Sequence, residues 1–540
     1  MQMNPGRRGG AWWPLVLAIG FFSICMLLTF SYPSSFWIVT DYEPLGLADA
    51  LNMAYRLADR QMYEAVGMAY HPGVTLYLLS WLALALTGYP VASGENFFST
   101  VLGHVEDYHR MILILGALVG SAGVYVFARA ARNLVPVGVT AAGAALWLVS
   151  TSATLQMFMS VGMDAFALLI NGLFLAVLVP LAHEEEIDPS IVVLAGCVGA
   201  LAYLNKLSYI YIPFALSAAI FMKLVFCKAG LSRGFWLLTV YLGTFALMIV
   251  ATAFLIIDWE GFRELISYHK SVVLGSELYG AGDRTVVSAG EVRRAIAAIP
   301  VDRAYAVPIA LFGGAGLALA GLVTGFRRAG QIPLAVLCIG TGVAAVLSAL
   351  IVLKHYDIHY TAGVSATLPA CVVCSYLLTK SWSFGPRLVG ATLVGIAILV
   401  MAFEVQGMLS TVVAVRMNNN RLAKADLEEI NSHVAGSKRA VEFAYKTPFA
   451  QFGEGFVILY ASVPRLTYEY FKTRPQVVSS LVADQVTRDV GAYVIDKHYF
   501  PTVESVRAAP NLALLDPKPS KFNDGDKLIE LRTVFLLIRG

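Results

Sequence analysis

The chain has 540 residues, of which 58% are apolar and 14% are charged, and its mean hydropathy is +0.68. Soluble domains are nearer half apolar and a quarter charged, so this composition excludes a soluble enzyme, a disordered scaffold and a collagen-like chain. The net charge of +3, from 39 basic and 36 acidic side chains, is too small to indicate a nucleic-acid partner. The composition therefore predicts an integral membrane protein.

Long apolar runs recur from the N-terminus to about residue 404. A helix needs about 20 predominantly apolar residues to cross a bilayer. By that measure we expect about eleven transmembrane helices in an all-α polytopic membrane domain over residues 1–404. The predicted spans are 12–32, 111–131, 137–159, 165–182, 191–205, 208–226, 235–257, 306–325, 332–353, 361–379 and 388–404.

One further apolar run, 74–88, is short and lies between His71-Pro72-Gly73 and Gly88-Tyr89-Pro90. Short runs of this kind are often re-entrant or interfacial, so we predict that it does not cross. Residues 33–110 then form one large first external loop.

The distribution of lysine and arginine supports this assignment. If the chain crosses once per predicted span, the basic residues of the short loops all fall on one side of the membrane, which is the cytoplasmic side by the positive-inside rule. Crossing by 74–88 would put several of them outside. The N-terminus is therefore predicted to be cytoplasmic. These residues are Arg7, Arg8, Arg129, Arg132, Lys223, Lys228, Arg233, Arg327, Arg328, Lys380 and Arg387.

The composition changes after the last predicted span. Residues 405–540 mix polar and apolar side chains, with helical patterning near 421–445. Strand-like runs follow at 456–461, 492–495 and 534–538. We expect a soluble extracytoplasmic α/β domain.

Ionisable residues at a membrane edge are costly, which makes them functional candidates. Asp41 and Glu43 directly follow the first span, and residues i and i+2 of an extended segment face the same way. Asp164 is a lone acid between two apolar spans. A helix N-cap is the alternative interpretation of both Asp41 and Asp164.

Basic candidates lie on the same predicted face. Lys206 interrupts a long apolar stretch, either as a lysine that snorkels to the interface or as a cation that binds phosphate. Residues 354–360 are dense in hydrogen-bond donors and include Lys354, His355 and His359. The two histidines are four apart, which permits zinc, but no glutamate lies between them in a metalloprotease pattern.

Several short motifs occur in an order that resembles the membrane glycosyltransferases of the GT-C superfamily. The likeness is to the protein O-mannosyltransferases and the bacterial lipid A aminoarabinose transferases, which use polyprenyl-phosphate sugars as donors. It departs from their pattern where Tyr42 splits the acidic pair and where Gly73 replaces a second proline. The motifs are Asp41-Tyr42-Glu43, Tyr70-His71-Pro72-Gly73, Arg110 at the start of a span, Arg129 with Arg132, Asp164, and residues 201–206, which end in Lys206.

The resemblance implies an enzyme that moves a hexosyl or pentosyl group from a polyprenyl-phosphate carrier to a hydroxyl acceptor at the outer face of the membrane. Asp41 is the expected base, which would invert the anomeric centre, while Glu43 and Asp164 support it or orient the acceptor. Positive charge around the leaving phosphate would come from six further side chains. These are His71, Arg110, Lys206, Lys354, His355 and His359.

The resemblance also bears on cofactor, partners and location. Some GT-C members need a divalent metal, which admits Mg²⁺ or Mn²⁺ between Asp41 and Asp164; no other cofactor is expected. The expected partners are the donor lipid, the bilayer and an unidentified lipid, glycan or protein acceptor. We expect the protein in the bacterial inner membrane. A polymerase or transporter of lipid-linked sugars would handle the same substrates and stays open as an alternative, although a secondary transporter usually shows an internal repeat, and none is visible.

Overall fold

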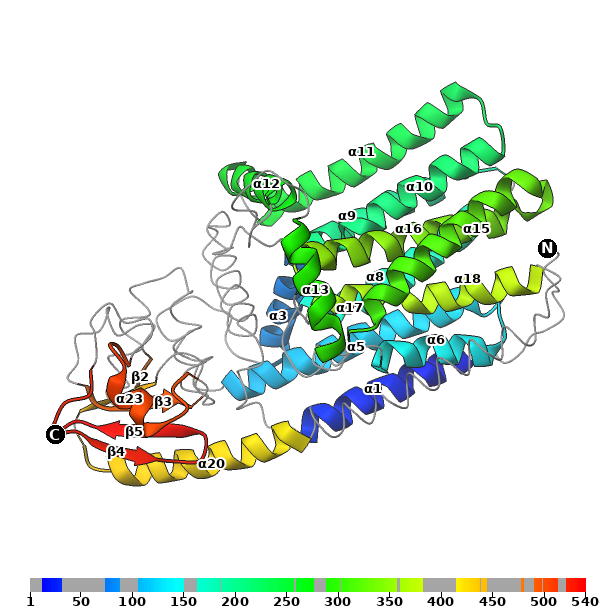
Figure 1. Ribbon diagram of the computed structural model, residues 1–540. Helices are drawn as coiled ribbons and strands as arrows, with labels where there is room; N and C mark the ends of the chain where they lie inside the picture. The colour runs from blue at the N-terminus through cyan, green and yellow to red at the C-terminus, as the bar shows by residue number, and fades with distance from the viewer. Residues whose placement is uncertain are drawn as a thin grey trace.

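A bundle of long helices carries a small mixed α/β domain at one end in the computed structural model (Figure 1). The structure describes residues 12–31, 73–87, 105–149, 163–184, 186–256, 259–275, 288–302, 304–356, 360–381, 414–437, 439–443, 477–479, 490–497, 499–512 and 521–540.

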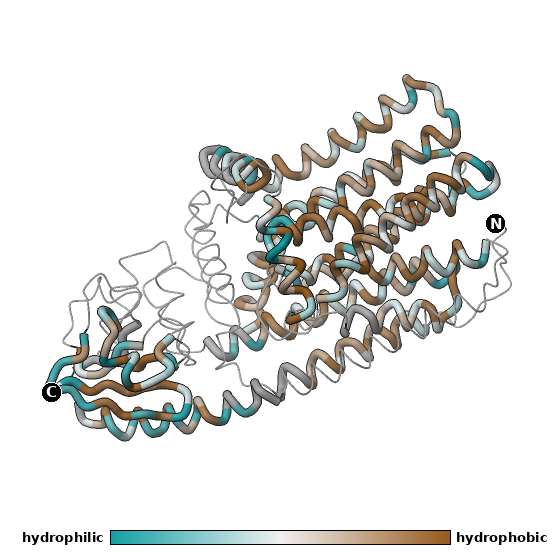
Figure 2. The backbone as a smooth tube through the Cα atoms, viewed as in Figure 1, coloured by the Kyte–Doolittle hydropathy of each residue, from teal (hydrophilic) through white to brown (hydrophobic). Residues whose placement is uncertain are grey.

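Within these residues, seven helical stretches are long and apolar enough to cross a membrane. They confirm seven of the predicted spans, and Figure 2 shows hydrophobic residues along their length. The stretches are Arg110–Ala131 in α5 (Val105–Ala131), Asp164–His183 in η2 (Met163–Phe166) and α8 (Ala167–His183), Leu207–Phe226 in η3 (Leu207–Ile210) and α10 (Tyr211–Phe226), Leu231–Thr252 in α11 (Leu231–Ile256), Ala306–Arg327 in α14 (Ala306–Pro308), η5 (Ile309–Gly313) and α15 (Gly314–Arg327), Ile332–Lys354 as α16, and Thr361–Ser381 in α17 (Thr361–Ser365) and α18 (Leu368–Ser381).

Four predicted spans have a different outcome. The spans predicted at 12–32, 137–159 and 191–205 contain shorter apolar helices, which are α1 (Trp13–Ser31), α6 (Val137–Val149) and α9 (Pro189–Asn205). The span predicted at 388–404 and the domain boundary at 404 lie outside the described residues. A total of eleven spans therefore stays a prediction.

The run predicted not to cross forms α3 (Val74–Thr87), a helix of 14 residues. At 1.5 Å per residue it is about 21 Å long, which is short of the roughly 30 Å hydrocarbon core. It packs against α5 and α9, and Figure 1 draws it at a steep angle to the long helices. Its length agrees with a segment that does not cross.

Among the described residues, the turns that carry the predicted cytoplasmic charges lie at one end of the bundle (Figure 1). Lys223 Nζ, near the end of α10, donates to the carbonyl of Ala182 near the end of α8 at 2.8 Å. Arg328, which follows α15, donates to the carbonyl of Ser381 at the end of α18 at 3.3 Å. The positive-inside pattern therefore corresponds to one physical face.

Close helix packing holds the bundle together where the hydrophobic effect does not drive association. A Cβ at Gly123 of α5 would overlap the backbone of Leu168, and one at Gly172 of α8 would overlap the carbonyl of Gly123. The two backbones are therefore in direct contact. α16 packs in turn against α10, α15 and α18.

Two amphipathic helices, α12 (Trp259–Leu274) and α13 (Ala289–Val301), lie at the bundle end opposite the basic turns (Figure 1). α13 begins at the cap residue Ser288, whose side chain accepts a hydrogen bond from the Glu291 backbone N–H at 3.0 Å. Polar and apolar faces of this kind suit an interfacial position.

The C-terminal domain is a five-stranded sheet in the order β2-β1-β3-β5-β4. β1, β2 and β3 are parallel, whereas β5 is antiparallel to both β3 and β4. Helix α20 (Ala414–Val434) covers one face and α23 (Val503–Ala508) covers the other. The strands are β1 (Ala440–Phe443), β2 (Val477–Ser479), β3 (Val490–Asp496), β4 (Lys527–Glu530) and β5 (Val534–Ile538).

Alternation along β3 explains why this strand is central. Ala492 and Val494 face the α20 side, whereas Tyr493 and Ile495 face the α23 side. The predicted strands at 492–495 and 534–538 are confirmed, while the strand predicted at 456–461 lies outside the described residues.

The helical patterning predicted for 421–445 is wrong at its C-terminal end. The helix ends at Val434, and Gly436 takes a left-handed conformation with φ 83°. This is the usual conformation just past a helix C-terminus. Residues 440–443 then join the sheet as β1.

Candidate functional site

A buried ion pair occupies the bundle end opposite the basic turns. Lys206 Nζ lies 2.9 Å from Asp164 Oδ2, and the other carboxylate oxygen accepts a hydrogen bond from the Tyr209 hydroxyl at 2.9 Å. The three residues come from the segments that begin α8, end α9 and begin α10. The structure thus joins two of the predicted site residues.

The local backbone explains how Lys206 reaches this position. Helix α9 ends at Asn205, and Lys206 has an extended backbone with φ −162° and ψ 139° before η3 begins at Leu207. This break in the helix turns the side chain toward the start of α8, where Asp164 lies in the short 3₁₀ turn. If the helix were unbroken, Lys206 and Leu207 would continue α9 instead of forming this turn.

The burial of the pair decides between the alternatives for each residue. The Lys206 side chain is 5% exposed, so this lysine does not snorkel to the interface. The Asp164 carboxylate is 14% exposed, and its partners among the described residues are side chains rather than helix N–H groups, so it is not an N-cap. Buried charges are costly unless they are paired, and each of these satisfies the other.

Aromatic rings enclose the ion pair. Lys206 Nζ lies 4.8 Å from the ring centroid of Tyr360, a cation–π contact. Tyr360 in turn contacts the His355 ring, with ring centroids 5.4 Å apart. His355 therefore reaches the lysine through Tyr360.

A second group of polar side chains, Tyr211 and Asn171, lies next to Tyr209. Tyr211, whose ring centroid is 5.9 Å from that of Tyr209, donates a hydrogen bond to the carbonyl of Gly363 at 3.1 Å. Asn171 Nδ2 donates to the Tyr211 hydroxyl at 3.0 Å. These bonds tie α8, α10 and α17 together beneath the ion pair, which keeps its geometry rigid.

The start of α3 docks beside Lys206. The Gly73 backbone N–H donates to the carbonyl of Asn205 at 3.2 Å, and the Thr75 hydroxyl donates to the Asn205 side chain. Gly73 has φ 49°, a value closed to proline, whose ring holds φ near −65°. This explains why glycine stands where the resembling family carries a second proline.

Solved structures of other proteins share this architecture. No protein-family model matches the sequence, and no curated protein sequence matches it. Among solved structures, ArnT from Cupriavidus metallidurans matches in two states, each over 98% of this chain and 98% of that chain at 11% identity. The TM-score is 0.51 for the apo state and 0.50 for the complex with undecaprenyl phosphate. The chain shares the fold of ArnT.

A weaker likeness is to the oligosaccharyltransferase of Archaeoglobus fulgidus in its apo form. It covers 91% of this chain and 71% of that chain at 14% identity, with a TM-score of 0.39. The ArnT match spans both the bundle and the C-terminal sheet. The shared fold therefore extends over both parts of the chain, including the tail that sequence motifs did not explain.

Two other predicted phosphate ligands of the bundle have different partners. Among the described residues, Arg110 pairs with Asp107 at 3.7 Å on the exposed start of α5. Lys354 Nζ donates to the carbonyl of Val273 at 2.6 Å, near the C-terminus of α12. Neither contacts the Asp164–Lys206 pair in this conformation, so their role at the phosphate stays a prediction.

The remaining predicted residues are not described. Asp41, Glu43, His71 and His359 lie outside the described residues, although Gly73, two residues along the chain from His71, contacts Asn205. Their roles, including Asp41 as the base, stay predictions.

The residues present do not fit a divalent metal at Asp164. Its Oδ2 atom already faces an ammonium at 2.9 Å, and a divalent cation placed there would be repelled by that charge. Among the described residues, no group of three histidine, cysteine, aspartate or glutamate side chains could hold a metal. The two-carboxylate site with Asp41 and the zinc site with His359 each involve a residue outside the described ranges.

Sequence reasoning missed Tyr209 and Tyr360. Tyr209 follows Lys206 by three residues, a spacing that brings side chains together on a helical turn. That spacing was a usable signal. Tyr360 ends the donor-rich 354–360 segment, and its contact with Lys206 depends on a fold that brings the end of α9 and the start of α17 together.

Proposed function

We propose that this protein transfers a sugar from a polyprenyl-phosphate carrier to a hydroxyl acceptor at the outer face of the bacterial inner membrane. The observation that carries the proposal is the buried Asp164–Lys206 pair, closed by Tyr209 and Tyr360. In this proposal the pair supplies a fixed cation for the lipid phosphate. The fold shared with ArnT, which has been solved with undecaprenyl phosphate, supports this choice of lipid.

Lys206 is the proposed contact to the donor phosphate. The sugar–phosphate bond breaks with its electron pair on the phosphate oxygen, so negative charge builds there in the transition state. A fixed ammonium in a site of low polarity stabilises that charge without reorganisation. Lys206 is held by Asp164 and by the Tyr360 ring, which makes it such a group.

Asp164 takes a positioning role in this mechanism. The sequence suggested that it orients the acceptor or holds a metal, but its two oxygens are engaged by Lys206 and Tyr209. We therefore assign it to holding the lysine. Asp41 remains the proposed base: it accepts the proton of the acceptor hydroxyl as that oxygen attacks the anomeric carbon opposite the phosphate. A single displacement of this kind inverts the anomeric centre.

A transfer assay tests this function. Purified protein in lipid nanodiscs is given an undecaprenyl-phosphate sugar labelled in the sugar, with cell-envelope extract as the acceptor source. Label should pass from the donor to envelope material, which mass spectrometry would then identify. General-base help is worth about 10²–10⁴-fold, so Asp41→Asn should lower turnover at least about 100-fold while donor binding persists. Wild-type turnover by Asp41→Asn would remove it as the base, and no transfer by the wild type would end the proposal.

Orientation has its own test. Asp107 is exposed beside Arg110 at the site end, and the native Cys227 is exposed near the basic turns. In intact cells, a membrane-impermeant thiol reagent should label Asp107→Cys and should leave Cys227 unmodified. Permeabilised cells provide the control, in which both react. The reverse pattern would put the ion pair in the cytoplasm.

A further inference from the structure

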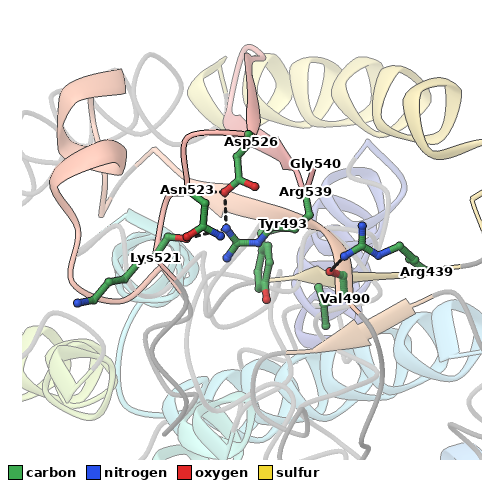
Figure 3. Close-up of a pocket in the computed structure, with 9 residues that line it drawn as sticks. Arg439, Val490, Tyr493, Lys521, Asn523, Asp526, Arg539 and Gly540 are labelled. Atoms are coloured by element: carbon green, nitrogen blue, oxygen red, sulfur yellow. Dashed lines mark hydrogen bonds and ion pairs between the residues drawn. The ribbon is translucent and has the colours of Figure 1, made fainter.

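A cavity of about 640 Å³ opens at one edge of the C-terminal sheet, away from the ion pair of the bundle (Figure 3). The starts of β1 and β3, the end of β5 and the turn before β4 meet there. Its polar and aromatic lining consists of Arg439, Tyr493, Lys521, Asn523, Asp526 and Arg539. The one anionic side chain of this lining, Asp526, is paired with Arg539, so Arg439 supplies the guanidinium of the lining that this pair does not neutralise.

Arg539 is fixed in place from three sides. Its guanidinium forms an ion pair with Asp526 and donates to the carbonyl of Lys521 at 2.6 Å. It also lies over the Tyr493 ring, 4.8 Å from the centroid. The Arg539 side chain is 12% exposed, so this wall of the pocket is a rigid, largely buried ion pair.

Arg439 forms the opposite wall. Its Nη2 donates to the carbonyl of Val490 at 3.4 Å, and its stem crosses the backbone at Gly491, where a Cβ would overlap it. Figure 3 shows Arg439 and Arg539 on opposite sides of Tyr493, whereas the Lys521 side chain extends away from both. Arg439 is thus the second guanidinium beside the aromatic ring.

These features select a class of ligand. Guanidinium groups bind carboxylate and phosphate oxygens through paired N–H donors, so the lining favours an anion. The volume falls within the roughly 300–1,000 Å³ of small-molecule pockets and is far larger than a bare phosphate needs. Tyr493 and the exposed Asn523 amide add partners for a ring that carries hydroxyls. A sugar with one negative group matches the guanidinium groups, the volume and the partners for hydroxyls.

We propose that this pocket binds an anionic sugar unit of the acceptor, carrying a carboxylate or a phosphate. The pocket and its ligand class stand on the lining alone, while the word acceptor rests on the proposed transferase function. Figure 1 places the C-terminal domain beyond the bundle end that carries Asp164, which suits capture of a substrate from outside the bilayer. The domain then delivers the acceptor, and the bundle holds the donor.

Calorimetric titration of the full-length protein in nanodiscs tests the ligand class. The probes are glucuronate, glucose 6-phosphate, glucose and inorganic phosphate. Both charged sugars should bind, and more tightly than glucose or phosphate. Arg439→Gln should weaken them about tenfold, the size expected for one charge-assisted hydrogen bond. Lys521→Gln should weaken them less, because its side chain points away.

A matched control comes from the same domain. Arg507 on α23 also lies over an aromatic ring, 5.5 Å from the centroid of Phe522, but it does not line the cavity. Arg507→Gln should leave binding unchanged. Equal binding by Arg439→Gln and the wild type would overturn the site. Phosphate binding as tight as that of the charged sugars would overturn the sugar assignment.

The transfer assay separates this proposal from the proposed function. With limiting envelope acceptor, Arg439→Gln should raise KM for the acceptor and leave kcat and undecaprenyl-phosphate binding unchanged. An unchanged KM together with charged-sugar binding would show that the bound sugar is not the acceptor. If the wild type binds charged sugars but transfers nothing, the transferase function fails while the pocket stands.

Discussion

Asp164 in the membrane bundle and Asp426 in the C-terminal domain are both buried carboxylates, but their partners differ. Asp426, on α20, is fully buried and accepts hydrogen bonds from the backbone N–H groups of Arg532 at 3.0 Å and Thr533 at 2.6 Å. Asp164 is held by two side chains, Lys206 and Tyr209. The backbone donors fix Asp426 to one turn, whereas the side-chain donors of Asp164 join segments from separate helices.

The comparison assigns a different purpose to each acid. Asp426 also accepts from the Arg532 guanidinium and the Thr533 hydroxyl, so each of its oxygens has two partners. It joins α20 to the turn between β4 and β5, which is a structural task. Asp164 holds a buried cation where three helical segments meet, and this is the cation that we propose contacts the donor phosphate.

The largest expected effect comes from breaking the bundle pair. Lys206→Met leaves a largely buried carboxylate unpaired, which should cost about 3–5 kcal/mol of stability. The double variant Lys206→Met/Asp164→Asn removes both charges and should recover most of that stability. Its turnover should still stay at least about 100-fold below the wild type, since removal of one stabilising donor costs that much in other enzymes. Thermal unfolding and sugar transfer measure the two effects.

Lys223→Met is the matched control for this cycle. Lys223 is also a buried lysine, but it bonds backbone carbonyls at the opposite end of the bundle. It should lower the unfolding temperature without changing donor binding. Wild-type transfer by the double variant would show that the Asp164–Lys206 pair is only structural.

The second effect belongs to Asp426. Asp426→Ala leaves two backbone N–H groups without a hydrogen-bond acceptor, and each should lower the stability by about 1–3 kcal/mol when it is buried. Hydrogen exchange in residues 414–443 and 521–540 should rise, while undecaprenyl-phosphate binding should not change. Glu429→Ala removes an exposed partner of the same Arg532 and should have little effect. Loss of lipid binding in Asp426→Ala would contradict the structural assignment.

A smaller effect is expected at Tyr209. Tyr209→Phe removes one hydrogen bond to Asp164, so stability should fall by about 1 kcal/mol and donor affinity several-fold. Tyr211→Phe is the control, because that hydroxyl bonds Asn171 and Gly363 instead. Equal losses of donor affinity in the two variants would mean that Tyr209 and this group of polar side chains act as a whole and that the Asp164 contact has no special role.

The smallest effect concerns an exposed ion pair. Arg233 lowers the pKa of Glu186 below its ordinary value, through a hydrogen bond at 2.9 Å in the turn with the basic residues. A lowered carboxyl pKa stabilises the fold above the unfolded value and loses that contribution as the pH falls through the folded value. Both side chains are exposed, so Glu186→Gln should leave the unfolding temperature at neutral pH within error. A large drop would show that exposed pairs matter as much as the buried one.

The sequence identified Asp164 and Lys206 because each interrupts an apolar run, where a charge is costly. It did not predict their pairing, because 42 positions separate them and contact requires the turns beside α8 and α9 to meet. Lys354 illustrates the opposite limit. It carries the same signal as Lys206, yet its ammonium bonds a carbonyl at the end of α12. A lone charge marks a polar environment without naming the partner.

The fold likewise has features that the local sequence predicts and features that it does not. Hydropathy located seven spans well, because length and apolar content are local properties. The sheet order places β1 and β3 side by side although 46 residues lie between them, which no local pattern reveals. The pocket beside Arg439 was missed for that reason: its walls come from four separate segments.

Gly123 and Gly172 hold α5 and α8 together as one unit. Because the backbones of α5 and α8 touch there, these two helices can neither move closer nor slide past one another without a clash. They therefore move as one rigid unit. A thicker or thinner bilayer changes the tilt of such a rigid helix pair rather than the distance between its two helices. Asp164 lies in the turn just before α8, so a tilt that α5 and α8 share would carry its carboxylate with it.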